Sequence, residues 1–182
     1  MGKKILSIVL FFFFFYEGFA QNKLTDSLKH LLTITTADTA RVITIIDMAL
    51  QFRNTRPDST IYYCDQALAL SRKINFKRGE AYALTTTGLA MREKGELPRS
   101  LELQIQALQI AESNNYPIET AFCYRRIGLV YMDIQDYNTC LHYLYLALHK
   151  QENIPYARGV AIEQMNLAMT YEYMNKPDSA LY

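Results

Sequence analysis

Residues 121–147 read AFCYRRIGLVYMDIQDYNTCLHYLYLA, and the rest of the chain repeats the pattern of this stretch. Small residues such as Gly128, Cys140 and Ala147 stand where two packed helices have to touch, and large residues fill the seam between them. Forty residues earlier the same frame holds Leu84, Thr87, Gly88, Met91, Ser100 and Ala107. Forty residues later it holds Leu167, Ala168, Tyr171 and Ala180. The sequence therefore predicts an array of repeats with a period of about 40 residues.

The repeats are predicted to span residues 38–77, 78–117, 118–157 and 158–182, with the last one incomplete. The dipeptide Arg78-Gly79 returns two periods later as Arg158-Gly159, and the tripeptide at residues 57–59 returns three periods later at 177–179. Agreement at this many positions without drift in register is hard to obtain by chance. Few stretches alternate with a period of two, so strands are not expected.

Each repeat is predicted to hold two helices. In the second repeat the first helix spans residues 80–94 and stops at Gly95, a residue suited to a left-handed C-cap. The next helix has Pro98 in its first turn and runs to about Ser113. In the first repeat Asp58 stands where a helix needs an N-cap, and Asp178 does the same in the fourth.

Packing explains the small residues. Gly88 and Gly128 of the first helices are predicted to face Ser100 and Cys140 of the second, because a bulky pair there would force the two helices apart. Ala107 and Ala147 would let the first helix of the following repeat dock closely, while leucines fill the space between layers. One hairpin cannot bury its apolar face alone, so stacking stabilises the array. The predicted fold class is all-α, a right-handed superhelix of antiparallel helix hairpins.

Residues 1–20 have the layout of a cleaved secretory signal. Lys3 and Lys4 precede an apolar run that includes five phenylalanines, and small residues ending at Ala20 precede Gln21. Cleavage is therefore expected after Ala20, with an uncleaved anchor as the alternative, and the mature chain is expected to be periplasmic or extracellular without inserting in the membrane. Residues 21–37 are predicted to form an N-terminal capping helix; a mobile leader is the alternative for this segment.

The composition excludes several classes of function. Removing Lys3, Lys4 and Glu17 with the leader leaves equal numbers of basic and acidic residues, so no electrostatic footprint for nucleic acid is present. His142 and His149 lie seven residues apart on one predicted helix, too far for one metal ion. No cofactor, metal site or catalytic set is predicted, because the glycines are scattered and no nucleophile has a paired base in view.

The cysteines and two pairs of acidic residues are expected to be structural. The cysteines Cys64, Cys123 and Cys140 are predicted to be free small hydrophobes, with a Cys123–Cys140 bridge as a minor alternative. The acidic pairs Glu93/Glu96 and Asp133/Asp136 flank hairpin turns, where solvated charges are ordinary. The chain is consequently predicted not to be an enzyme; an unrecognised catalytic site is the competing hypothesis, although nothing breaks the repeat frame where such a site would lie.

The chain resembles the tetratricopeptide repeat family, whose pattern is aromatic-x2-Leu-Gly-x2-Tyr, then Ala-x3-aromatic, then Ala. The third repeat follows it best, at Tyr124, Ile127, Gly128, Tyr131, Cys140, Leu144 and Ala147. The first repeat departs most, with Asp47 and Met48 at the leucine and glycine positions. The family's usual period is 34. The extra residues are expected to lengthen the helices and linkers such as Asn114–Pro117.

The resemblance implies a protein-binding or peptide-binding role through the concave face, which the first helix of each repeat lines. The residues that it assigns to this face are Tyr82, Leu89, Arg92, Phe122, Arg125, Leu129, Met132, Met165, Met169 and Tyr173. Leu89, Leu129 and Met169 replace the asparagine of the family's clamp for acidic carboxyl termini, so an adaptable groove for an apolar or amphipathic segment is expected. Arg92 and Arg125 are expected to pair with an acidic side chain of the partner. The alternative is that these side chains only pack against neighbouring helices.

The chain resembles in particular the exported repeat regions ahead of a membrane segment in bacterial sensor kinases and regulators. This resemblance implies a sensory or scaffold part of a larger signal-transduction protein. In register, Ala180-Leu181-Tyr182 falls early in the second helix of the fourth repeat, so a longer parent protein is expected. The competing hypothesis is a structural or assembly protein without a selective ligand.

Overall fold

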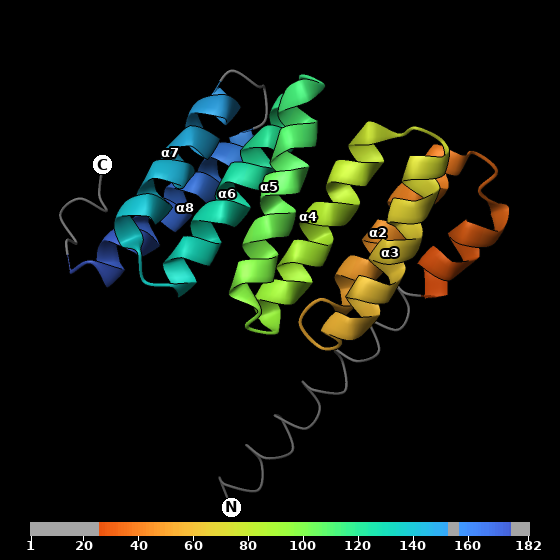
Figure 1. Cartoon of the computed structure of the whole chain (residues 1–182), viewed down its shortest axis with the longest axis horizontal. Helices are drawn as coiled ribbons and strands as arrows, with labels where there is room; N and C mark the ends of the chain where they lie inside the picture. The colour runs from red at the N-terminus through yellow and green to blue at the C-terminus, as the bar shows by residue number, and fades with distance from the viewer. Residues whose placement is uncertain (1–25, 153–156, 176–182) are drawn as a thin grey trace, which may run out of the picture.

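The computed structural model describes residues 26–152 and 157–175, and the described chain is an array of antiparallel helices (Figure 1). Residues 26–34 are helical and precede the array. The helices that follow are α2 (Asp38–Phe52), α3 (Pro57–Lys73), α4 (Lys77–Glu93), α5 (Leu97–Ser113), α6 (Pro117–Asp133), α7 (Tyr137–Glu152) and α8 (Ala157–Tyr173). The predicted signal peptide and the residues after 175 lie outside the described part.

The repeat has an internal half-period of 20 residues. From α3 onward each helix begins 20 residues after the previous one, and three-residue turns such as 94–96 and 114–116 join the helices. The middle residue of these turns has a positive φ, as does the second residue after α8: Asn75, Gly95, Asn115, Gln135 and Asn175. Gly95 is thus the left-handed residue that the sequence predicted. The segment at Asn114–Pro117 is not a lengthened linker, because Pro117 already belongs to α6; the long period lies in the helices.

The small residues lie at the helix crossings, as predicted. A Cβ atom on Gly88 would come within 3.2 Å of the Ser100 carbonyl oxygen, and one on Gly128 within 3.2 Å of the Cys140 carbonyl oxygen. The Ser100 hydroxyl also donates a 2.7 Å hydrogen bond to the Gly88 carbonyl. A side chain at either glycine would therefore push α4 from α5, or α6 from α7.

The predicted N-cap of α3 was wrong by two residues. Arg56 is the N-cap, and Asp58 is the second residue of the helix because Pro57 takes the first position. Asp58 still lies in the first turn, where a negative charge interacts favourably with the helix dipole. Its carboxylate accepts a 2.9 Å bond from Lys94 of the following hairpin. Asp178, the predicted equivalent, lies outside the described residues.

The buried core runs along the array as a chain of small clusters. Val42 and Ala67 of the first repeat form one with Ala83 of α4, and Leu84, Ala107 and Cys123 form another around α4–α6. A third joins Cys140 and Leu144 of α7 to Leu167 of α8. Every cluster therefore bridges neighbouring repeats, which is how stacking stabilises a solenoid.

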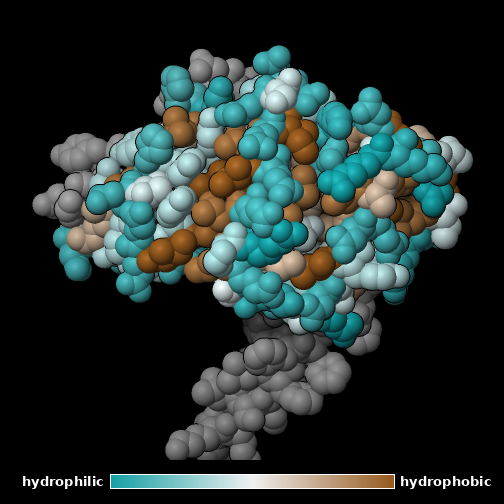
Figure 2. All heavy atoms as spheres, in the orientation of Figure 1, coloured by the Kyte–Doolittle hydropathy of each residue, from teal (hydrophilic) through white to brown (hydrophobic). Residues whose placement is uncertain are grey.

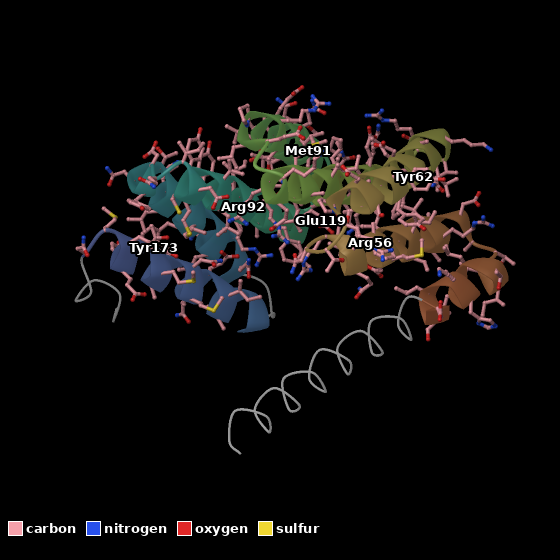
Figure 3. The ribbon with its side chains drawn as sticks, turned by 90° about the horizontal axis from the view of Figure 1, so that it is seen from below. Arg56, Tyr62, Met91, Arg92, Glu119 and Tyr173 are labelled. Carbon is pink, nitrogen blue, oxygen red and sulfur yellow. The ribbon has the colours of Figure 1, made fainter. Side chains whose placement is uncertain are left out.

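The array curves toward the layer formed by α2, α4, α6 and α8. Direct contacts join α2 to α4 and α4 to α6, while no comparable contact joins α3 to α5 or α5 to α7 in the described chain. Helices on the inside of a bend lie closer together than those on the outside. Figure 3 shows the two layers edge-on, with α3 and α5 above α2 and α8. The α2/α4/α6/α8 layer therefore forms the concave face.

The face seen in Figure 2 is largely hydrophilic, with apolar atoms gathered where α5, α6 and α7 lie.

At the N-terminal end, Leu28 and Leu32 of the first helical segment are half-buried, whereas Leu31 and Ile34 are exposed. None of the helices in the described ranges is long and apolar enough to cross a membrane.

Candidate protein-binding groove

A cavity of about 150 Å³ lies on the concave face, where α2, α4 and α6 approach one another. We call it the arginine pocket, and its lining residues are Leu50, Arg53, Ala81, Tyr82, Thr85, Thr86, Leu89, Glu119, Phe122, Arg125 and Arg126. Its walls are mostly apolar, and its charged groups are three arginines and one glutamate. In Figure 3, Arg92 and Glu119 lie below Met91 and Tyr62, toward α2 and α8. This volume suits a single side chain better than a cofactor, since small-molecule sites commonly exceed about 300 Å³.

Most charges of the concave face are already paired within the chain. Arg92 donates to both carboxylate oxygens of Asp133, at 2.6 and 2.8 Å. Arg125 donates a 3.1 Å bond to Glu163, and Glu119 accepts a bond from Arg78. Each pair joins the first helices of adjacent repeats, so these charges hold the concave layer together.

Arg126 differs from these arginines because no hydrogen bond or ion pair to it is found in the described part of the chain. Its side chain is half-buried and borders the arginine pocket. Burial, together with the positive charges of Arg125, Arg53 and Arg92, lowers the pKa of Arg126 to about 10. At neutral pH the guanidinium is still charged, so the pocket holds a cation that the fold does not neutralise.

Two aromatic residues shape the pocket. The Phe122 ring lies under the guanidinium of Arg125, whose Cζ is 4.7 Å from the ring centroid. The Tyr82 hydroxyl donates a 3.2 Å bond to the half-buried Asp47, whose pKa is raised by burial despite that bond. Both residues therefore contact neighbouring side chains and also form part of the pocket wall.

The concave face continues beyond the pocket onto α8. Met165, Met169 and Tyr173 are 57%, 38% and 55% exposed, although Tyr173 also stacks on Tyr137. Leu129 of α6 is half-buried. Met132 instead packs against the core cluster of Cys140, Leu144 and Leu167. We use the term groove for the arginine pocket together with Leu129, Met165, Met169 and Tyr173.

The sequence-predicted residues separate into three groups in the structure. Tyr82, Leu89, Phe122 and Arg125 line the pocket; Leu129, Met165, Met169 and Tyr173 form the remainder of the groove; Arg92 and Met132 are engaged in internal pairing and core packing. The two arginines expected to meet an acidic partner, Arg92 and Arg125, are both already paired with carboxylates of this chain.

The lining residues that the sequence-predicted set lacks are Leu50, Arg53, Ala81, Thr85, Thr86, Glu119 and Arg126. The resemblance assigns to the groove the second, fifth, ninth, twelfth and thirteenth positions of each first helix, counted from Ala81, Ala121 and Ala161. Arg53 occupies the thirteenth position counted from Arg41, so applying this count to the divergent first repeat would have found it. Arg126 lies at the sixth position, outside that count.

The three cysteines are not part of the groove. Burial raises the pKa of the Cys64 thiol to about 12 and that of Cys123 to about 11, and burial also raises the pKa of Cys140. All three thiols are free and buried. No histidine lines the pocket, and the described residues hold no cluster of metal-ligating side chains. The charged groups that line the pocket are the three arginines and Glu119, and guanidinium groups are suited to hold an anionic ligand group.

Comparisons with known proteins give likenesses of fold at low identity. No protein-family model matches the chain. Tetratricopeptide repeat protein 29 from Trypanosoma brucei brucei is 24% identical over 162 residues, covering 87% of this chain and 33% of that protein. The chain therefore spans about a third of the length of this curated relative.

Two solved structures superpose on most of the chain. A Rap protein complexed with competence and sporulation factor matches with a TM-score of 0.80 and 16% identity, over 93% of this chain and 48% of that chain. The nearly identical TPR-like repeats of a putative kinesin light chain from Podosopora anserina match with a TM-score of 0.63 and 12% identity, over 91% and 84% of the respective chains. The two structural matches agree on the fold, and the name of the curated relative is consistent with it.

Proposed function

We propose, from the premise that the chain folds as a tetratricopeptide repeat solenoid, that it is a protein-interaction module that holds a peptide segment of a partner in its groove. The observation that carries this proposal is the groove itself. A side-chain-sized pocket lies between α2, α4 and α6, and α8, the next helix of the same layer, exposes Met165, Met169 and Tyr173. Methionine and aromatic side chains adapt to varied apolar partners, and a pocket provides a fixed anchor beside them.

The relatives support the same kind of role. The Rap protein that shares the fold was solved in complex with competence and sporulation factor. Fold likeness alone does not assign a ligand. The groove residues of this chain must therefore carry the specificity, and they are the ones to test.

A phage-displayed library of random peptides provides the test. Peptides selected on the full chain should bind the Phe122→Ala and Met169→Ser variants at least about tenfold more weakly, because each change removes an apolar contact worth roughly 1.4 kcal/mol. Ile105→Ser is the matched control, since Ile105 is an exposed apolar residue of α5 in the other layer. Peptides that bind all three variants as tightly as wild type would place recognition elsewhere. Failure to enrich any peptide would favour a structural or assembly role.

We further propose that the module is the exported sensory or scaffold part of a larger signalling protein. The basic, apolar and small-residue order of residues 3–20 supports export, and the partial coverage of the trypanosome relative is compatible with a longer parent. Intact-mass measurement of the exported protein checks the proposed export and cleavage of the leader. Loss of residues 1–20 is expected, whereas a mature species that retains the phenylalanine run contradicts cleavage after Ala20.

A further inference from the structure

The arginine pocket contains positive charge that the described chain does not balance. Of its four charged lining residues, Arg125 is matched by Glu163 and Glu119 is matched by Arg78. Arg53 donates only to the side-chain oxygen of the adjacent Asn54, at 3.3 Å, and Arg126 has no partner among the described residues. The guanidinium groups of Arg53 and Arg126 are therefore available to bind one ligand group together.

An exposed arginine without a partner is common, but Arg126 is half-buried and surrounded by like charges. Arg125, Arg53 and Arg92 all act to lower its pKa, as does its burial. A half-buried cation that folding leaves without a partner lowers stability, and such departures from a consistent design are expected where a ligand completes the arrangement. The second independent observation is the cavity that this side chain borders.

The size and lining of the cavity define the ligand group. A volume of about 150 Å³ accepts one side chain. The Thr86 hydroxyl already donates to the Tyr82 carbonyl, and the Thr85 hydroxyl lies 3.6 Å from the Cys123 sulfur, so both hydroxyls already have a partner within the chain. Leu50, Leu89 and Phe122 provide apolar wall for a methylene stem. Guanidinium groups are planar, bidentate donors suited to a carboxylate.

We infer that the arginine pocket receives the side-chain carboxylate of a glutamate within the partner's peptide segment, held by Arg126 and Arg53, while neighbouring residues of the segment lie along α6 and α8. This inference rests on the proposed function and specifies its ligand. A glutamate within the segment fits better than a terminal carboxylate, because the exposed apolar residues of α8 lie in the same layer as the pocket and give the segment a surface along which to continue.

Positional-scanning libraries of hexapeptides with acetylated and amidated ends test the inference. Sub-libraries with glutamate, glutamine or aspartate fixed at one position would be titrated against the full chain, beside a library with a free carboxyl terminus. Glutamate should be preferred over glutamine by about tenfold or more, because only the carboxylate forms charge-assisted hydrogen bonds with the guanidinium groups. Added salt should reduce this preference.

Variants assign the preference to the pocket. Arg126→Gln and Arg53→Gln should each bring the glutamate-to-glutamine ratio close to one, and Arg126→Lys should restore part of it because it keeps the charge without the planar fork. Arg99→Gln is the control, since Arg99 is an exposed arginine of α5 paired with Glu102. Arg53 is exposed, so its replacement tests the inference even if the Arg126 variants fold poorly.

The outcomes separate this inference from the proposed function. Peptide binding that depends on Phe122 but shows no glutamate preference overturns the glutamate assignment and leaves the groove as the binding site. A stronger preference for free carboxyl termini also overturns it. A glutamate preference that survives Arg126→Gln and Arg53→Gln places the acidic group elsewhere. Absence of peptide binding altogether overturns the proposed function as well.

Discussion

Arg125 of α6 and Glu163 of α8 form a buried ion pair, with Nη1 and Oε1 3.1 Å apart. Arg125 lines the arginine pocket and Glu163 is fully buried, so the pair links the pocket to the last described helix. Gln151 of α7 donates a 2.9 Å bond to the same glutamate oxygen. Burial raises the pKa of Glu163 although Arg125 and the hydrogen bonds around the carboxylate oppose the rise. Ionising this residue is thus costlier in the folded state than in the unfolded chain.

The Glu163→Gln variant should reveal this cost through its pH dependence. A carboxyl group whose pKa is raised on folding stabilises the protein most below its unfolded value, and that contribution is lost as pH rises through the folded value. Wild type should consequently gain stability relative to Glu163→Gln as the pH falls from neutral toward the usual glutamate pKa. Urea unfolding of both proteins over this range measures the difference. A difference that is constant, or that moves in the opposite direction, contradicts the raised pKa.

Replacing Arg126 with methionine should stabilise the free protein. The change removes a half-buried charge that Arg125, Arg53 and Arg92 repel, while keeping a long apolar stem. A gain of about 0.5–2 kcal/mol in unfolding free energy is expected, typical of relieved charge repulsion. Added salt should reduce the difference in unfolding free energy between variant and wild type, because it screens the charge repulsion in wild type. Arg99→Met, which removes an exposed paired arginine, should show no such gain.

Gln135→Gly should also stabilise the protein. Gln135 has φ of 66° in the turn between α6 and α7, where Gly95 occupies the equivalent turn between α4 and α5. A left-handed conformation costs a residue with a Cβ about 1 kcal/mol or more, and glycine avoids that cost. Asparagine tolerates the conformation better, so Asn115→Gly should give a smaller gain. Thermal denaturation ranks the two variants, and a lower melting temperature for Gln135→Gly would refute the prediction.

Gly128→Leu should destabilise the protein by about 1–3 kcal/mol. Even the first carbon of the new side chain would lie 3.2 Å from the Cys140 carbonyl oxygen and 3.3 Å from Leu144. The remaining atoms have to displace α7. Lys150→Ala, at an exposed position of α7, is the comparison and should change stability by less than about 0.5 kcal/mol. Equal melting temperatures for the two variants would contradict the close crossing at Gly128.

The three thiols should resist alkylation in the native protein. Their raised pKa values keep them protonated near pH 8, and their burial excludes the reagent. Iodoacetamide without reductant should label Cys64, Cys123 and Cys140 fully in concentrated guanidinium and hardly at all in native buffer. Mass spectrometry counts the adducts. Rapid labelling of one native thiol contradicts its burial, and fewer than three adducts after denaturation would reveal a disulfide.

The repeat architecture could be predicted because small residues at fixed spacing leave a direct trace of helix contact. Gly88, Gly128, Ala107 and Ala147 are small for reasons that a single sequence shows. The N-cap of α3 could not be placed as well, because Asp58 suits the first turn nearly as well as the cap position.

Charge pairing in the groove was harder to predict than packing, because the partners lie in different repeats. Arg78 pairs with Glu119 and Arg92 pairs with Asp133, each 41 residues away in the first helix of the next repeat. A separation of one repeat period plus one residue can therefore be used to search a repeat sequence for such ion pairs. No sequence spacing identifies Arg126, because what distinguishes it is the lack of a partner among the described residues.

The linear order of contacts also determines how the molecule would respond to a pulling force. Contacts are most extensive within the hairpins α4–α5 and α6–α7, and less extensive across the seams α5–α6 and α7–α8. A load applied to the two ends of the array passes through all of these seams in series. The α5–α6 and α7–α8 boundaries would open first while the α4–α5 and α6–α7 hairpins stay intact, so this part of the array would extend in discrete steps.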